Sequence, residues 1–322
     1  MRTRIFLISL VLACGAVRAQ PVQPAPVGDF HQHLFSDETI ALIGPESGLK
    51  PLAATDLIPL LDAAGIKIAV LLSTAYMYGS PNRKVENEYA RTRRENDWTA
   101  AQAAQYPERL VALCGIAPMR DYALEEIRRC AGHPGLKRGI KMHLGNSDVQ
   151  LGNPAHVARL AEVFAAANAQ RLAIVVHMRA NIGKKRPYGA LEARAFLEKV
   201  LPAAPDVAVQ VAHMAGTGPG FEDPPAREVL AELAQAVERR HPATRNLWFD
   251  VASIADRDIT PDAAALLAKR IRQVGVSRVL YGSDSAQGDN LRPAEAWAAF
   301  RRLPLTDSEF AQIARNVPPY FQ

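Results

Sequence analysis

The sequence is poor in cysteine, with three in 322 residues. Cys14 lies in an apolar N-terminal segment, so only Cys114 and Cys130 remain for the folded chain. Two cysteines are too few for a disulfide framework, and their spacing matches no zinc-ribbon pattern. We therefore interpret both as structural residues, and the sequence leaves open whether they pair.

A strong excess of charge is also absent. The formal net charge is +5, and Arg2, Arg4 and Arg18 supply three of the positive charges, so the rest of the chain is near +2 (5 − 3). Such a balance gives no reason to predict a nucleic-acid-binding or membrane-surface patch. We expect the partner to be a small-molecule substrate, and leave a homo-oligomer open.

A long hydrophobic run is missing as well. The apolar segment from Ile5 to about Val17 is well short of the roughly 18 residues that span a bilayer. Arg2 and Arg4 precede it, and the small residues Val17 and Ala19 follow it. This is the pattern of a cleavable export signal.

The signal predicts cleavage between Ala19 and Gln20. Residues 1–19 are then the signal peptide, residues 20–28 (QPVQPAPVG) a proline-rich lead-in, and residues 29–322 a single domain. The mature protein is expected in the periplasm or outside the cell, with no membrane insertion after signal removal. An uncleaved anchor is the alternative, as is a lipid on Cys14, although Leu12 directly before Ala13 fits a lipobox poorly.

After the lead-in, short apolar runs alternate with longer amphipathic runs. The short runs are near Asp29–His33, Ile66–Ser73, Leu110–Ala117, Leu136–His143, Leu172–His177, Val207–His213, Leu247–Ala252 and Val276–Asp284. The longer runs that predict helices are Ala53–Ala64, Val85–Tyr106, Pro154–Gln170, Leu191–Leu201, Pro225–Arg240 and Pro261–Val274. Nearly continuous apolar runs are typical of parallel strands that are covered on both faces.

Eight strands separated by helices predict an α/β fold, a single (β/α)₈ TIM barrel. A doubly wound open sheet is the rival, and it commonly carries a glycine-rich phosphate turn after its first strand. Here the first strand ends in DFHQHLF instead. The sequence shows neither an internal repeat nor an obvious linker.

Histidines mark the first predicted strand. Residues two apart in a strand point to the same face, so His31 and His33 project together. Two imidazoles on one face can begin a catalytic metal site. Ionisable residues also end the later strands, namely Lys141 and His143 (GIKMH), His177 (AIVVHM), His213 (VAHMAG) and Asp284 (LYGSDS). Catalytic groups of a barrel lie at these carboxyl ends, so we predict that they meet at one mouth.

These strand ends resemble those of the amidohydrolase superfamily, and specifically of its amidohydrolase-related branch. That branch includes metal-dependent hydrolases and the decarboxylases similar to aminocarboxymuconate-semialdehyde decarboxylase. The terminal FAQIARNVPPYF, with Asn316, resembles the last helix of that family. The resemblance covers nearly all of the mature chain.

The resemblance implies a role for each matching residue. His31, His33 and His177 would ligate one divalent metal, for which zinc is the expected ion, and Asp284 would complete the site. Asp284 would also exchange a proton with the attacking water, while His213 would polarise the substrate or steady that water.

The resemblance leaves Lys141 ambiguous. In binuclear members a strand-four lysine is carbamylated and bridges two metals, but we expect one metal and place Lys141 and His143 in the substrate pocket. Arg179 and Asn181 follow His177 in the same loop and are further substrate-binding candidates. Arg179 could pair with a substrate carboxylate, and an ordinary ion pair is the alternative.

Taken together, these residues predict an exported metal-dependent hydrolase that cleaves an ester, lactone or amide with activated water. One alternative is metal-dependent non-oxidative decarboxylation, which would use the same ligands. The other is a non-catalytic periplasmic binding protein on a decayed barrel. A decayed site would be expected to have lost a ligand, and none of the matching positions has been lost.

Overall fold

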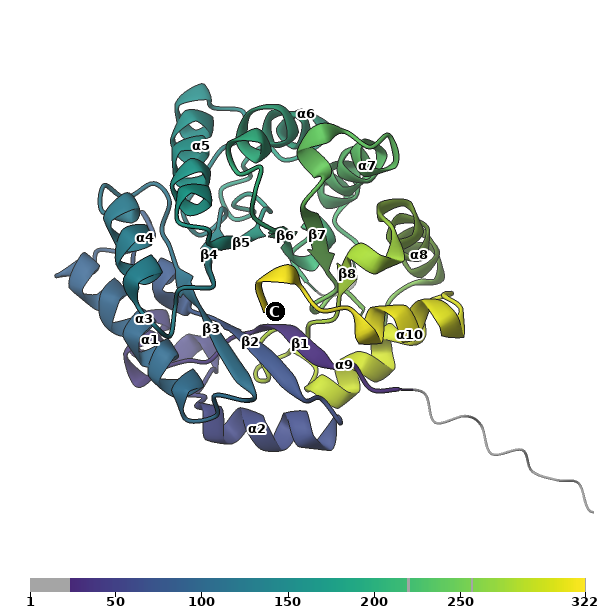
Figure 1. Cartoon of the computed structure of the whole chain (residues 1–322), viewed down its shortest axis with the longest axis horizontal. Coiled ribbons are helices and arrows are strands. Elements are labelled where there is room, and N and C mark those ends of the chain that lie inside the picture. The colour runs from purple at the N-terminus through teal and green to yellow at the C-terminus, as the bar shows by residue number, and fades with distance from the viewer. Residues whose placement is uncertain (1–23, 219–220, 256, 322) are drawn as a thin grey trace, which may run out of the picture.

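The computed structural model describes residues 24–218, 221–255 and 257–321, which form one barrel (Figure 1). Its strands lie in the order β1-β2-β3-β4-β5-β6-β7-β8, and neighbours along this order pair in parallel. The strands are β1 (Gly28–Gln32), β2 (Ile68–Leu72), β3 (Leu110–Gly115), β4 (Gly139–His143), β5 (Ala173–His177), β6 (Val209–Val211), β7 (Leu247–Asp250) and β8 (Val279–Leu280). Each of the eight predicted runs overlaps one strand, which confirms the TIM-barrel prediction.

Hydrogen bonds between β1 and the segment that follows β8 close the barrel. The Phe30 amide donates to the Tyr281 carbonyl (2.9 Å), and the Asp284 amide donates to the His31 carbonyl (2.8 Å). Beneath this seam the fully buried Asp29 carboxylate accepts from the Ser283 amide (3.1 Å) and the Ser283 hydroxyl (2.6 Å). The closure therefore brings the end of β1 against the segment that carries Asp284.

Helices surround the strands as an outer ring (Figure 1). They are α1 (Asp37–Ile43), α2 (Ala54–Ala63), α3 (Glu88–Ala104), α4 (Ala123–Gly132), α5 (Pro154–Ala169), α6 (Ala190–Ala195), α7 (Pro224–Glu238), α8 (Pro261–Val274), α9 (Pro293–Phe300) and α10 (Asp307–Arg315). Five of the six predicted helices are present as single α-helices. In the sixth, α6 changes to a π-helical turn (Phe196–Val200) and then a 3₁₀ turn (Leu201–Ala203), where Pro202 cannot supply a backbone donor.

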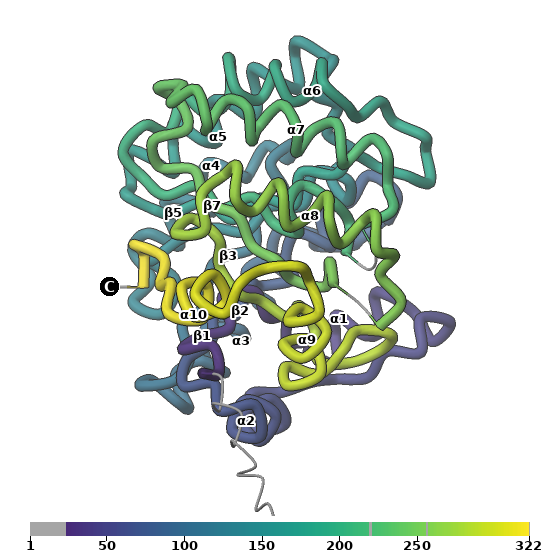
Figure 2. Tube along the Cα trace, turned by 90° about the vertical axis from the view of Figure 1, so that its right-hand side faces the viewer, coloured from purple at the N-terminus to yellow at the C-terminus, as the bar shows by residue number. Residues whose placement is uncertain are grey.

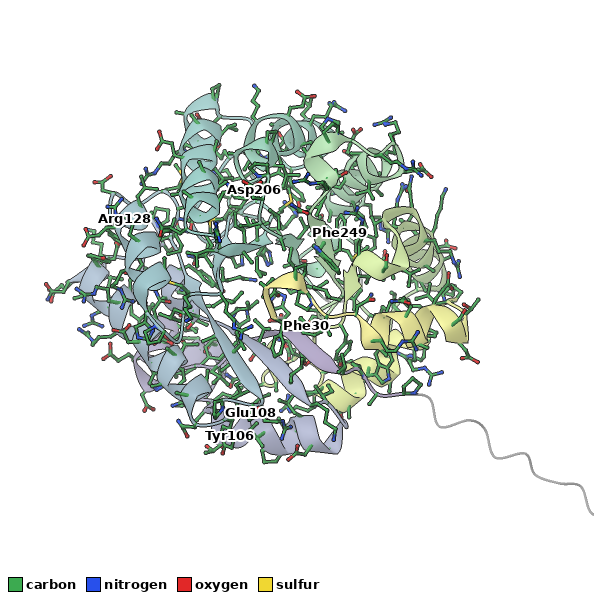
Figure 3. The ribbon with its side chains drawn as sticks, viewed as in Figure 1. Phe30, Tyr106, Glu108, Arg128, Asp206 and Phe249 are labelled. Atoms are coloured by element: carbon green, nitrogen blue, oxygen red, sulfur yellow. A yellow bond between two sulfur atoms is a disulfide. The ribbon has the colours of Figure 1, made fainter. Side chains whose placement is uncertain are left out.

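The core has two parts. The larger part lies between the sheet and the helices and includes outward-facing strand residues such as Ile140 and Ile174. The smaller part consists of inward-facing residues that include Phe30, Val70 and Leu280. Figure 3 shows Phe30 near the middle of the ring and the exposed Arg128 at its outer edge.

A C-terminal 3₁₀ turn, Pro319–Phe321, covers one end of the barrel (Figures 1 and 2). Arg138 holds it by donating to the carbonyls of Tyr320 (3.2 Å) and Phe321 (2.6 Å), and the Phe321 ring packs edge-on against Phe30. The Tyr320 hydroxyl reaches inward and donates to Gln210 Oε1 (2.6 Å). Because this end is filled, access to the interior is from the opposite end, where the strands finish.

A disulfide joins Cys114 in β3 to Cys130 in α4, so the two cysteines left open by the sequence are paired. None of the helices in the described part of the chain is long and apolar enough to cross a membrane. The predicted cleavage point at Ala19 and Gln20, and the lipobox-like Cys14, lie outside the described residues.

Candidate metal centre

The ionisable side chains predicted at the strand ends meet at the barrel mouth. They line a cavity of about 220 Å³, whose lining residues include His33, Lys141, His143, His177, His213 and Asp284. His31 lies directly beneath, with its Nε2 3.3 Å from that of His33. These residues belong to five different strands or the turns that follow them, so only the closed barrel brings them together.

The imidazoles of three histidines are each held by a hydrogen bond at Nδ1. His33 Nδ1 lies 2.6 Å from the Leu72 carbonyl, and His213 Nδ1 lies 2.7 Å from the Ala252 carbonyl. A carbonyl oxygen only accepts, so Nδ1 carries the proton in both rings. In the neutral form of each ring the Nε2 lone pair is then left for a metal or a water molecule.

His31 is held in the same way by a carboxylate. Its Nδ1 donates to Asp250 Oδ2 (2.9 Å), and both side chains are fully buried. Although burial raises it, the pKa of Asp250 is well below its ordinary value because His31 and His213 lie beside the carboxylate. Burial, followed by the nearby Lys141 charge, lowers the pKa of His31 to about 4, so the ring is neutral and its Nε2 lone pair is available.

The free nitrogens converge with a carboxylate. Asp284 Oδ1 lies 3.9 Å from His31 Nε2 and 3.7 Å from His33 Nε2. Two imidazole nitrogens and a carboxylate oxygen within ligand reach of one another form a set that suits a divalent cation. The two Nε2 atoms lie 3.3 Å apart, and neither has a proton to donate to the other, so a cation fits between them better than a direct contact.

The Lys141 side chain points towards the Nε2 atom of His31, beside the same three groups. Its Nζ lies 3.2 Å from His31 Nε2, and the side chain is 1% exposed. Burial lowers the pKa of Lys141 to about 8. The structure therefore places Lys141 against the predicted ligands and on the lining of the inner cavity, and its role in substrate binding stays a prediction.

The remaining histidines lie to one side of this set. His143 and His177 stack with ring centroids 3.8 Å apart, and the His177 centroid is 5.0 Å from that of His213. Burial, and then the neighbouring His143, hold the pKa of His177 well below its usual range. Among the described residues, His177 is not in the close donor set of His31, His33 and Asp284, so its role as a ligand remains a prediction.

Unusual backbone conformations accompany these residues. Asp284 has φ of 67°, and His213, Met214 and Ala215 have φ of 52°, 47° and 68°. Left-handed φ values at residues other than glycine are uncommon, and they tend to occur where a functional side chain must point in a particular direction. Here they turn His213 and Asp284 towards the mouth as the chain leaves β6 and β8.

Asp250 is a site residue that the sequence analysis missed. Its Oδ2 accepts from His31 and from Gln210 Nε2 (2.7 Å), and its Oδ1 accepts from the His213 amide (2.9 Å) and the Ala252 amide (3.2 Å). It therefore orients two histidines at once. Its position in the sequence could have identified it, because Asp250 ends β7 just as other ionisable residues end their strands.

An outer cleft of about 560 Å³ adjoins the inner cavity and shares three lining residues with it, His143, His177 and Thr217. The predicted substrate-binding residues Arg179 and Asn181 both line this cleft. Arg179 Nη2 and Nε donate to the two Asp223 oxygens (3.2 and 2.5 Å), so its guanidinium is committed to an internal ion pair. Asn181 Nδ2 donates to the Gly145 carbonyl (3.0 Å) and braces the loop.

A larger cavity, about 730 Å³, lies away from this centre. Val209, Leu247 and Arg278 line it, at the beginnings of β6, β7 and β8. Barrel enzymes carry their chemistry at the opposite ends of the strands. Size alone therefore does not identify the reactive site.

Sequence comparison finds a family model, described as Amidohydrolase, that matches residues 29–316. No curated protein sequence is significantly similar to the chain.

Solved structures share the fold at low identity. A 5-carboxyvanillate decarboxylase from Sphingomonas paucimobilis is 16% identical, with a TM-score of 0.62 over 90% of this chain and 96% of that one. A dihydroxybenzoic acid decarboxylase from Polaromonas sp. JS666, with manganese and an inhibitor bound, is 16% identical, with a TM-score of 0.60 over 90% and 94%. A structure named as a probable 2-pyrone-4,6-dicarboxylic acid hydrolase, from Acinetobacter baumannii, is 17% identical, with a TM-score of 0.57 over 89% and 96%.

Proposed function

The chain belongs to the amidohydrolase family, and on that premise we propose that it is a metal-dependent hydrolase that cleaves an ester, lactone or amide. The observation that carries the proposal is the donor set at the mouth. His31 and His33 direct the Nε2 atoms of neutral rings at one point, and the Asp284 carboxylate faces the same point. His177 is proposed as the further ligand, and zinc as the ion.

A divalent ion held there would lower the pKa of a water molecule to about 7 and would polarise the substrate carbonyl. The chain's own groups then move the protons. Asp284 has a side chain that is 19% exposed at the mouth, so it can take a proton from water and return it to the leaving group. His213 keeps its Nδ1 proton on the Ala252 carbonyl, so its Nε2 can accept a hydrogen bond from that water and orient it.

Decarboxylation is the second candidate. It is favoured by the names of two structures that share the fold, both of which are decarboxylases of aromatic acids. The third is named as a hydrolase of a pyrone dicarboxylic acid. The donor set alone would serve either reaction, so the distinction must be made by the products.

Export is also proposed. The Arg2 and Arg4 charges, the short apolar run and the small residues before Gln20 support a cleaved signal and a periplasmic or secreted protein. The Cys114–Cys130 disulfide supports the same location, because disulfides persist mainly in oxidising compartments.

The test is a product analysis on purified protein. Zinc-loaded and metal-depleted samples are incubated with a panel of esters, lactones and amides, and with a panel of hydroxybenzoic acids. We expect acid release from the first panel that disappears with the metal and returns with zinc. Carbon dioxide release from the second panel, with no hydrolysis in the first, would establish decarboxylation instead.

A further inference from the structure

Two arginines line the outer cleft, and only one of them is used by the fold. Arg179 is 7% exposed and forms its ion pair with Asp223, and its guanidinium lies 4.8 Å above the Tyr188 ring. Arg83, on the loop after β2, is half-buried and makes no ion pair with any residue that the structure describes. Its backbone amide donates to the Ser80 carbonyl (3.1 Å), but its guanidinium makes one hydrogen bond to a described residue, a long one from Nη1 to Asn146 Oδ1 at 3.5 Å.

The surroundings of Arg83 leave its charge uncompensated. The cleft's described polar lining includes Ser80, Asn82, Asn146 and Asn181, and none of its described lining residues is acidic. A guanidinium has five donors in a planar fork that matches a carboxylate, so most of its capacity here remains open to a ligand. The cleft therefore favours an anion at this position.

Asn146 connects Arg83 to the metal centre. The backbone amide of Asn146 donates to His143 Nδ1 (3.1 Å). The side-chain nitrogen of Asn146 donates to the backbone carbonyl of Tyr76 (2.9 Å). The Tyr76 ring in turn packs 5.5 Å from His143 and 6.4 Å from His33, centroid to centroid. Since the outer cleft and the inner cavity share His143 and His177, one molecule can contact Arg83 and also reach the metal ligands.

We propose that Arg83 determines specificity and that the substrate carries a carboxylate remote from the bond that is cleaved. Arg83 binds this carboxylate, and the reacting carbonyl lies in the inner cavity beside His33 and Asp284. This inference rests on the proposed hydrolase function and adds the substrate class. Arg179 takes no direct part in binding, because its guanidinium is held by Asp223.

The test uses matched chromogenic esters on the zinc-loaded protein. One series is the mono-4-nitrophenyl esters of dicarboxylic acids from succinate to suberate, and the other is the same esters with the free carboxylate capped by methyl. Wild type should prefer the free acids. Arg83→Met should lose about 10- to 100-fold in kcat/KM on the preferred free acid, mainly through KM, as expected for a lost charged hydrogen bond.

Controls separate this contact from general charge and from folding. Arg83→Met should stay within about threefold of wild type on the capped ester, because the lost charge makes no contact with it. Lys185→Met removes one positive charge from the exposed neighbouring loop, outside both cavities, and should leave the preference unchanged. Arg83→Lys should restore part of it, and circular dichroism should show all three variants folded. An equal loss on free and capped esters, or an unchanged preference, would overturn the proposal.

A binding measurement keeps the inference separate from the hydrolase proposal. If wild type cleaves neither series, the hydrolase proposal is wrong for these bonds, and calorimetric titration with glutarate decides the role of Arg83. A Kd that is about tenfold weaker in Arg83→Met than in wild type supports carboxylate recognition. The same Kd in both proteins contradicts it.

Discussion

Replacing Asp250 by Asn should weaken metal binding, although Asp250 is not itself expected to contact the metal. The carboxylate accepts four hydrogen bonds, two at each oxygen. Asn has only one acceptor oxygen. If that oxygen faces the amides of His213 and Ala252, the new NH₂ faces His31 and competes with its Nδ1 proton.

The His31 ring must then move its proton to Nε2, the atom that should bind the metal, or lose its hydrogen bond. If the Asn amide is reversed, its NH₂ faces the two backbone amides, and buried unsatisfied donors cost about 1–3 kcal/mol each. Both orientations are therefore unfavourable. Loss of such an orienting carboxylate typically costs about 10- to 100-fold in metal affinity, or about 1.4–2.7 kcal/mol.

The assay is a competition titration of zinc against a chromophoric chelator, with wild type, Asp250→Asn and the exposed control Asp121→Asn. Thermal unfolding of the metal-free proteins shows how much of the effect is stability. Zinc affinity of Asp250→Asn within twofold of wild type, in a folded protein, would refute the role assigned to Asp250. An equal loss in Asp121→Asn would show that the effect is nonspecific.

The other predictions address single features. His31→Ala should abolish stoichiometric metal binding and keep the far-ultraviolet spectrum of the barrel, and elemental analysis of wild type should find one metal per chain, whereas two would revive a bridging lysine. Asp284→Asn should lower kcat by about 10²–10⁴-fold, as for a lost general base. Retention of full activity would exclude Asp284 as the general base. Reducing the Cys114–Cys130 disulfide, which closes a loop with a sequence separation of 16, should cost about 3 kcal/mol of unfolding free energy in a urea titration, and no change would contradict that value. N-terminal sequencing of protein recovered from the periplasm should begin near Gln20, and a chain that retains Met1 would contradict export.

The barrel could be predicted because its signal is repeated. Each strand is an apolar run buried on both faces, and eight such runs separated by helical segments allow few arrangements. Helices α1 and α9 were not predicted, because with seven and eight residues they are too short to show a helical period clearly. The π-helical turn after α6 was not predictable, since Phe196–Val200 continues the helical pattern of the sequence.

The site could be predicted only where its residues lie at the carboxyl ends of the strands. His31, His33, His177, His213 and Asp284 could be selected because each follows or ends an apolar run. The roles of Arg179 and Arg83 could not be assigned in this way. Which arginine is neutralised depends on Asp223, 44 residues from Arg179 along the chain, and such a contact becomes visible only in the folded structure.

The most direct test of the account follows the oxygen of the attacking water. The zinc-loaded protein is given its best ester, lactone or amide in water enriched in oxygen-18, and the acid product is weighed by mass spectrometry after a single turnover. We predict one labelled oxygen in each molecule of product acid. The labelled acid should form only with the metal-loaded protein, and Asp284→Asn should form much less of it. Turnover without label in the product, or undiminished turnover after metal removal, would contradict metal-dependent hydrolysis.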